Sequence, residues 1–239
     1  MKLSTIAKTS LALGILTTGV MTTYAQSADA EGFTSGKVTL LSSQEASKLN
    51  SLKEYYGKKA LDLRNVQGQR IGDKVSIIDN VQLTEVTLTE KDKNRLKNND
   101  FSDFDVFIVK EGTGRDATIQ SIGGITKPNS LKNIDYVASP QLSITRKSGE
   151  YTATHNDAPF LINKEEISLK ELDFKLRKQL MEKHGLYKEN VSNGKIVVKM
   201  KSEDKNDKYT FDLSEKLQKE RMGDVIVDTT KIDRIEVSL

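Results

Sequence analysis

The segment ISLKELDFKLRKQLMEKHGLY, residues 167–187, constrains the fold more than any other part of the chain. Its leucines recur at the three- and four-residue spacing that places them on one face of a helix. Ser168 and Glu171 form an S-x-x-E capping box at its start, and Gly185 stands where the helix would end. The segment therefore predicts one long amphipathic helix. Two oppositely charged pairs at i,i+4 spacing are each expected to add about 0.2–0.5 kcal/mol: Glu171 with Lys175, and Asp173 with Arg177.

Before this helix, apolar and polar residues alternate with a period of two, as in strands. Three segments alternate or are rich in β-branched residues, between Gly, Asn and Asp turns: KALDLRNVQGQRI, DKVSIIDNVQLTEVTLT and FDVFIVKEG. Short strands without long helices between them predict a small barrel or sandwich. Gly123 and Gly124, in SIGGITKPN, indicate a bend or a close approach of two backbones. A short helix, residues 47–58, is expected to precede these strands.

Three further strands are predicted after the long helix: GKIVVKM, DKYTFDL and DRIEVSL. A short helix in LSEKLQKERM, residues 213–222, is expected between the last two. One long helix packed on a mixed sheet is an α+β arrangement. The length of the chain suits two compact domains, which we place at residues 47–138 and 139–239.

The sequence of residues 1–30 predicts a secretory signal peptide. Lys2 and Lys8 make a positive start, an apolar run follows over residues 10–20, and ADA at 28–30 supplies small residues for cleavage. The apolar run is about half of the ~20 residues that a membrane-spanning helix needs. We therefore expect a secreted protein without membrane insertion, which begins with a polar arm, residues 31–46.

Composition argues against several classes of function. The chain has no cysteine, so disulfides and thiolate chemistry are excluded. Its formal net charge of +3 is spread over many residues of both signs, which does not make the basic field that nucleic acid requires. Phe104 and Phe107 alternate with acidic residues, and we interpret them as core rather than as stacking platforms.

Catalytic and cofactor motifs are not apparent. There is no G-x-S-x-G sequence, and neither histidine has a serine partner at a recognisable spacing. Gly112 and Gly114 lack the strand-then-helix context of a nucleotide site and are interpreted as a hairpin turn. We expect a binding protein and not an enzyme, with no cofactor.

Metal binding has little support. His155 and Asp157 would face the same side of a strand, but two ligands are incomplete for zinc. His184 stands at the end of the long helix, where a positive charge is favourable. We expect no metal site.

A spaced motif in and before the long helix indicates a family. It reads Lys164-x2-Ile167-x4-Leu172-Asp173-x3-Arg177-x2-Leu180-x5-Leu186-Tyr187. This spacing resembles the staphylococcal and streptococcal superantigen signature at every fixed position. The ends of the chain, MKLSTIAKTSLALGILTTGV and RMGDVIVDTTKIDRIEVSL, look like the staphylococcal superantigen-like exoproteins. Ile122 replaces the tyrosine of the family's other signature and Asn129 lies too close to it, a variant compatible with the superantigen-like branch.

The resemblance implies an N-terminal oligosaccharide/oligonucleotide-binding (OB) barrel and a C-terminal β-grasp domain built around residues 169–183. Members of the superantigen-like branch bind host glycans, innate receptors, immunoglobulins or complement factors, and T-cell superantigen activity is not expected. The implied partners are sialylated glycoproteins of leukocytes. The alternative is a Toll-like receptor, an immunoglobulin or a complement protein bound without a glycan. The family often forms homodimers.

The segment YTFDLSEKLQKERMGDVI, residues 209–226, is the candidate binding site. One subset of the family is similar in using a threonine, an acidic residue, a lysine and an arginine at this spacing to bind sialyl Lewis X. The resemblance places five residues in such a site: Thr210, Asp212, Lys216, Arg221 and Asp224. An arginine can form charge-assisted hydrogen bonds with a sialic acid carboxylate, and carboxylates can accept hydrogen bonds from sugar hydroxyls. A strand with charged neighbours is also typical of a solvated surface without a ligand.

Overall fold

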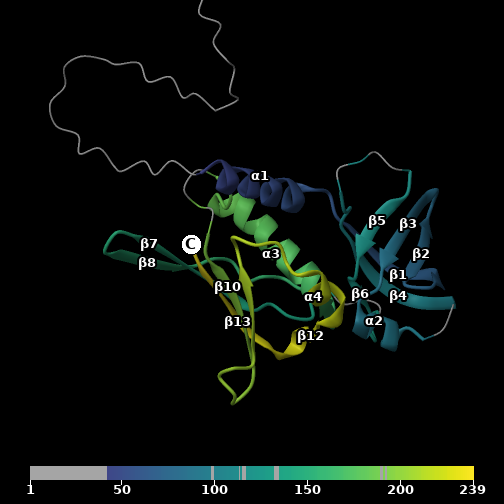
Figure 1. Cartoon of the computed structure of the whole chain (residues 1–239). Helices are drawn as coiled ribbons and strands as arrows, with labels where there is room; N and C mark the ends of the chain where they lie inside the picture. The colour runs from purple at the N-terminus through teal and green to yellow at the C-terminus, as the bar shows by residue number, and fades with distance from the viewer. Residues whose placement is uncertain are drawn as a thin grey trace, which may run out of the picture. The chain divides into compact units, whose positions relative to one another are not determined.

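The computed structural model describes residues 42–97, 100–112, 114, 117–131, 135–188, 191 and 193–239 (Figure 1). The predicted signal peptide and most of the predicted polar arm lie outside the described residues. The first helix, α1 (Ser43–Gly57), begins earlier than the sequence predicted, so residues 43–46 do not belong to a polar arm. The reason is a capping box that the sequence reading missed: Ser42 N donates to Glu45 Oε2 at 2.9 Å, and Glu45 N donates to Ser42 Oγ at 3.3 Å.

The first half of the described chain forms a six-stranded sheet in the order β5-β3-β2-β1-β4-β6. Its elements are β1 (Leu61–Ile71), β2 (Lys74–Asp79), β3 (Gln82–Thr87), α2 (Glu90–Arg95), β4 (Asp100–Ile108), β5 (Ile119–Ile122) and β6 (Ile125–Thr126). Strand β1 pairs with both β2 and β4, and its pairing with β4 contains register shifts. The sheet curls around a core that includes Val75, Val106 and Ile125. Phe104 and Phe107 are buried, as predicted. The sequence reading missed α2.

The second half forms a five-stranded mixed sheet in the order β11-β10-β13-β7-β8. Its elements are β7 (Gln141–Ser148), β8 (Tyr151–Asn156), β9 (Glu166–Ser168), α3 (Leu169–His184), β10 (Lys195–Met200), β11 (Lys208–Asp212), α4 (Lys219–Asp224), β12 (Ile226–Asp228), the 3-10 turn η1 (Thr229–Lys231) and β13 (Ile232–Ser238). Strands β9 and β12 make a separate pair. The long helix α3 lies along this sheet (Figure 1), and its Leu172 and Leu176 share one core with Ile196 and Ile235. The α+β prediction is confirmed.

Helix α3 has the predicted ends. Ser168 Oγ accepts from the Glu171 backbone N–H, and Gly185 ends the helix in the left-handed conformation at φ 71°. The Glu171 carboxylate does not complete the capping box. It binds Lys175 and lies 2.8 Å from Lys164 Nζ instead.

The two predicted ion pairs of α3 form, but the weak surface energies expected for them do not apply. The acidic partners, Glu171 and Asp173, are each only 1% exposed. Arg177 is also buried, and its Nε donates to Asp173 Oδ1 at 2.7 Å. A buried charge must be paired, so removal of one partner costs several kcal/mol rather than a few tenths.

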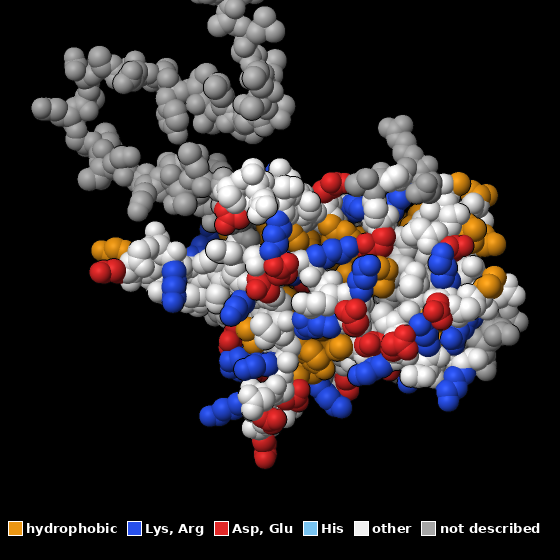
Figure 2. Space-filling model, in the orientation of Figure 1, with side chains coloured by type: hydrophobic (Ala, Val, Ile, Leu, Met, Phe, Trp, Pro, Cys, Tyr) orange, Lys and Arg blue, Asp and Glu red, His pale blue; other side chains and the backbone are white. Residues whose placement is uncertain are grey.

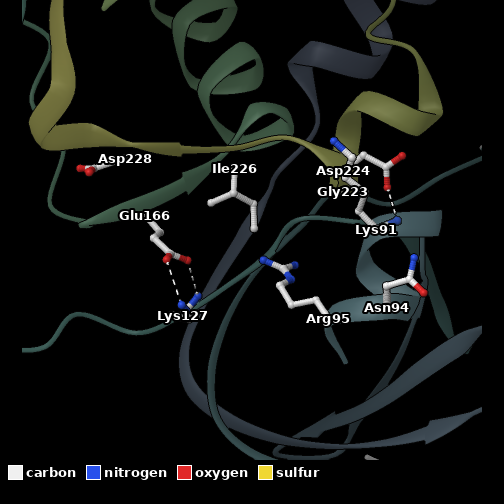
Figure 3. A pocket seen from close by; sticks show the side chains of 9 residues that line it. All are labelled: Lys91, Asn94, Arg95, Lys127, Glu166, Gly223, Asp224, Ile226 and Asp228. Carbon is white, nitrogen blue, oxygen red and sulfur yellow. Dashed lines mark hydrogen bonds and ion pairs between the residues drawn. The ribbon is translucent and has the colours of Figure 1, made fainter. Parts of the chain in front are cut away.

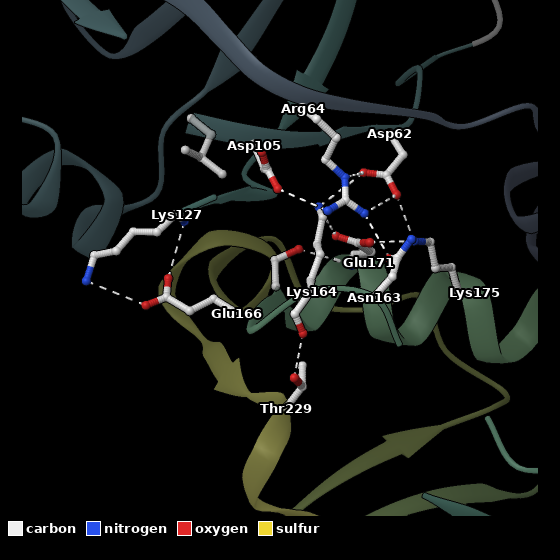
Figure 4. A network of polar contacts seen from close by, with 12 residues as sticks. Asp62, Arg64, Asp105, Lys127, Asn163, Lys164, Glu166, Glu171, Lys175 and Thr229 are labelled. Carbon is white, nitrogen blue, oxygen red and sulfur yellow. Dashed lines mark hydrogen bonds and ion pairs between the residues drawn. The ribbon is translucent and has the colours of Figure 1, made fainter. Parts of the chain in front are cut away.

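A cluster of charges ties α3 to the first strand of the barrel (Figure 4). Lys164 Nζ lies 3.1 Å from Asp62 Oδ1, and Lys175 Nζ lies 2.9 Å from Asp62 Oδ2. Burial alone would raise the pKa of Asp62, but the two lysines outweigh it and lower the pKa to about 2. Lys164, a residue of the superantigen signature, therefore joins the two halves by pairing with Asp62 of β1 and Glu171 of α3.

We expect the Asp62 carboxylate to make the free energy of unfolding depend on pH in the acidic range. The folded-state pKa of Asp62 is depressed, so its contribution is present above about pH 4 and lost as the pH falls toward about 2. Across that window the unmodified protein should lose about 1–2 kcal/mol more unfolding free energy than Asp62→Asn. Urea unfolding at several pH values measures this. The matched control is Asp207→Asn, an exposed carboxylate between β10 and β11. Parallel pH profiles for the Asp62 variant and the unmodified protein would contradict the assignment.

The Gly123–Gly124 pair marks a close backbone approach, as predicted. It lies between β5 and β6, and Gly124 N donates to Met222 O of α4 at 3.1 Å. A Cβ on Gly123 would lie 2.6 Å from Gly223 N. Beside it, Lys170 Nζ donates to Ser121 Oγ and to Ile122 O, both at 2.7 Å, and burial lowers the pKa of Lys170 to about 7. The Gly124 contact holds α4 against the barrel, and the Lys170 contacts hold α3 against it.

Candidate functional site

The candidate site is built on β11, the turn after it and α4. The sequence predicted a helix over residues 213–222, but the structure has a turn followed by the shorter α4. The Asp212 carboxylate explains the difference, since its Oδ1 accepts from Ser214 N at 2.9 Å and from Ser214 Oγ at 2.7 Å. Such a local bond competes with helix formation. Leu217 N donates to the buried Tyr56 hydroxyl at 3.2 Å, which fixes the turn.

Thr210 and Arg221 come together in this arrangement. Thr210 is exposed on β11, an edge strand of the five-stranded sheet, while its neighbour Phe211 points into the core. Arg221 Nη2 donates to Thr210 O at 3.0 Å, and its Nη1 donates to Gln218 Oε1 at 3.1 Å. The guanidinium carbon lies 5.6 Å from the centre of the Phe211 ring. Arg221 is therefore held in one orientation, beside Thr210.

Asp212 lies at the end of the same strand with an exposed carboxylate. The hydrogen bond from the Ser214 side chain lowers the pKa of Asp212, which keeps it ionised and able to accept hydrogen bonds. Its backbone oxygen accepts from Arg177 Nη2 at 2.9 Å. A buried arginine of α3 thus sets the position of the strand end.

Lys216 and Asp224 are engaged elsewhere. Lys216 Nζ lies 2.7 Å from Glu111 Oε2 and 3.6 Å from the centre of the Tyr55 ring. Asp224 Oδ1 accepts from Lys91 N of α2 at 2.7 Å. Both partners are distant in sequence, so sequence reasoning could not assign them.

A shallow depression with a volume of about 10 Å³ lies between these groups. Asp212, Lys216 and Arg221 line it, and so does Gln218, which the sequence reading missed. The spacing of Gln218 and Arg221 at i,i+3 near a helix start is a signal that could have found it. The structure thus places Asp212, Lys216 and Arg221 around the depression. Thr210 is linked to Arg221 through its backbone oxygen, and Asp224 lies at the end of α4.

The two histidines lie beside each other away from this site, with ring centres 5.6 Å apart. Asp157 pairs with His184, whose Nε2 lies 3.0 Å from Asp157 Oδ2, because β8 ends before Asp157. This hydrogen bond lowers the pKa of Asp157 to about 2. Within the described ranges, no three His, Cys, Asp or Glu side chains form a group that could hold a metal ion.

Comparison with known proteins gives the family. Residues 50–129 match the staphylococcal superantigen-like OB-fold domain, and residues 140–239 match the staphylococcal/streptococcal toxin β-grasp domain. The chain belongs to the staphylococcal superantigen-like family. It is 46% identical to Superantigen-like protein 11 of Staphylococcus aureus (strain Newman) over 239 residues, which cover all of both chains.

Two solved structures of relatives contain a glycan. Staphylococcal superantigen-like protein SSL5 complexed with sialyl Lewis X is 35% identical, with a TM-score of 0.72 over 80% of this chain and 99% of that one. A superantigen-like protein from Staphylococcus aureus in complex with sialyl-Lewis X is 38% identical, with a TM-score of 0.71 over 80% of this chain and 98% of that one.

Charges of both signs are mixed on the surface. Figure 2 shows Lys and Arg side chains interspersed with Asp and Glu over the face in view, without a large field of one sign. In the part of the chain that is described, no helix has both the length and the apolar character to cross a membrane.

Proposed function

We propose that this chain is a secreted immune-evasion protein that binds sialylated, fucosylated glycans of the sialyl Lewis X type on host leukocyte glycoproteins. Binding would block adhesion or receptor signalling without catalysis. The observation that carries the proposal is that Asp212 and Arg221 line one depression at the end of β11, where Arg221 also binds the backbone oxygen of Thr210. The two relatives solved with sialyl Lewis X support it.

Arg221 is proposed to clamp the sialic acid carboxylate. Guanidinium N–H groups match a carboxylate in geometry and charge. Arg221 uses one N–H toward Thr210 O and one toward Gln218 Oε1, so other N–H groups remain for a ligand. Because these bonds already fix the side chain, little rotamer freedom is lost on binding. The exposed Thr210 hydroxyl is proposed to bond the same sugar.

Asp212, Lys216 and Asp224 are proposed to bind sugar hydroxyls. The Asp212 carboxylate is exposed and accepts from a protein group through Oδ1 alone, which leaves Oδ2. Lys216 carries three N–H donors and uses one toward Glu111. Asp224 uses Oδ1 toward Lys91 and retains Oδ2. All three can therefore take part without breaking the contacts described above.

Sialidase treatment of leukocytes tests this function. Binding of the protein, residues 31–239, should fall to background on treated cells and remain on mock-treated cells, measured by flow cytometry with labelled protein. Undiminished binding to treated cells would contradict the proposal. That result would favour a Toll-like receptor, an immunoglobulin or a complement protein bound without a glycan.

A further inference from the structure

A second and larger cleft lies on the other end of α4, where the barrel meets the β-grasp domain. It is formed by α2, the residue Lys127 after β6, the β9–β12 pair and the end of α4 (Figure 3). Its volume is about 580 Å³, within the range of small-ligand sites. Of the residues proposed above for sialyl Lewis X binding, only Asp224 lines it.

The α2 side of this cleft presents hydrogen-bond donors that lack partners. Among the described residues, the Lys91 ammonium and the Asn94 side chain make no hydrogen bond or ion pair, although both line the cleft. Arg95 is anchored through Nη2 alone, to Asp92 and to Ile125 O at 2.8 Å. Its remaining N–H groups bond to no described residue, and Figure 3 shows the side chain extending toward Ile226. The groups on this side that remain free to donate hydrogen bonds are therefore two cationic side chains and one amide.

The acidic side chains of the cleft are already engaged. Glu166 Oε1 lies 3.5 Å from Lys127 Nζ, and Asp228 Oδ2 lies 3.3 Å from Lys231 Nζ. Asp224 accepts from a backbone N–H of α2. Arg95 is ion-paired with Asp92, whereas the Lys91 ammonium has no ion-pair partner among the described residues. Lys91 is therefore the cation of this cleft that would attract an anionic group, and the N–H groups of Arg95 that bond to no described residue could donate to it.

We propose that this cleft binds the acidic group, a sulfate or a carboxylate, of a host saccharide. A sugar ring offers hydroxyls that donate as well as accept, together with an apolar face. The cleft matches both, because Asp224 retains Oδ2 as an acceptor and Ile226 supplies an apolar wall. An acidic peptide could also use the cations, and the tetraglutamate arm of the test below distinguishes it from a saccharide. The site shares Asp224 with the residues proposed for sialyl Lewis X, but Arg221 and the depression around it do not line this cleft.

Nuclear magnetic resonance titration of ¹⁵N-labelled protein, residues 31–239, tests this site. The probes are a chondroitin 6-sulfate disaccharide, its unsulfated uronic acid counterpart, neutral lactose and a tetraglutamate peptide. An acidic disaccharide should cause saturable shifts of the Asn94 side-chain amide and the Gly223 backbone amide, and lactose should not. Saturation by the sulfated probe alone identifies a sulfate site, and equal saturation by both acidic disaccharides identifies a carboxylate site.

Variants make the test specific. Lys91→Ala combined with Asn94→Ala removes two donors that have no protein partner, so the fold should be kept and the affinity should fall at least about tenfold. Arg221→Ala and Lys219→Ala should leave the titration unchanged. The proposal is overturned by absent saturation, by equal shifts with lactose, by saturation with tetraglutamate alone, or by unchanged affinity in the double variant. Loss of the shifts in Arg221→Ala would also overturn it, by placing the ligand in the other depression.

Discussion

Replacement of Arg177 by methionine is expected to lower the free energy of unfolding by about 3–5 kcal/mol, because it leaves a buried carboxylate unpaired. Arg177 is 1% exposed and bonds Asp173, the Tyr187 hydroxyl and the backbone oxygen of Leu213. Its guanidinium carbon also lies 4.4 Å from the centre of the Tyr56 ring. Burial raises the pKa of Asp173, so the carboxylate needs the arginine in order to stay charged. Urea denaturation measures the loss.

Two further variants show whether loss of the buried Arg177–Asp173 pair causes the drop in unfolding free energy. Arg234→Met removes an arginine whose side chain is 45% exposed and forms surface ion pairs, and it should cost less than about 1 kcal/mol. Arg177→Met combined with Asp173→Leu removes both charges and should recover part of the lost stability. A small loss in Arg177→Met, or no recovery in the double variant, would contradict this account of the network.

Replacement of Arg221 by alanine is expected to weaken sialyl Lewis X binding about 10–100-fold, the effect of losing a charge-assisted hydrogen-bond donor. The fold should persist, because Arg221 is only partly buried and its bonds to Thr210 and Gln218 are exposed. Arg221→Lys should retain a charge but lose the paired donor geometry, and its affinity should lie between the two. Isothermal titration calorimetry with the soluble tetrasaccharide measures all three proteins.

The matched control is Lys219→Ala, on the same helix. Lys219 is exposed and has no partner among the described residues, so this variant removes a positive charge without touching the depression. Its affinity should stay within about twofold of the unmodified protein. Equal weakening in Lys219→Ala and Arg221→Ala would mean that overall charge, and not an Arg221 clamp, governs binding.

Local signals in the sequence were sufficient to predict the main elements. Ser168 and Gly185 marked the ends of α3, and both act there as caps. The Gly123–Gly124 pair indicated a close backbone approach, which the structure contains. The two caps depend on residues that are near in sequence, so they could be predicted directly. The glycine pair predicted a close approach but not its partner, Gly223, which is distant in sequence.

Long-range packing could not be predicted in the same way. The partners of Lys216 and Asp224, Glu111 and Lys91, come from the barrel. The ion pairs of α3 could be predicted from their spacing, but their burial depends on α1 and the barrel, which cover that helix face. Lys164 and Arg177, two residues of the superantigen signature, are buried and organise the scaffold, whereas the candidate glycan residues lie outside this signature.

A glycan-array screen of residues 31–239 tests the central claim most directly. The account predicts selective binding to sialylated, fucosylated lactosamines, with no binding to the same glycans after removal of sialic acid. The array also carries sulfated glycans without sialic acid, which report on the second cleft separately. An array without any signal on the sialylated, fucosylated glycans would contradict the claim and would leave residues 209–226 as scaffold.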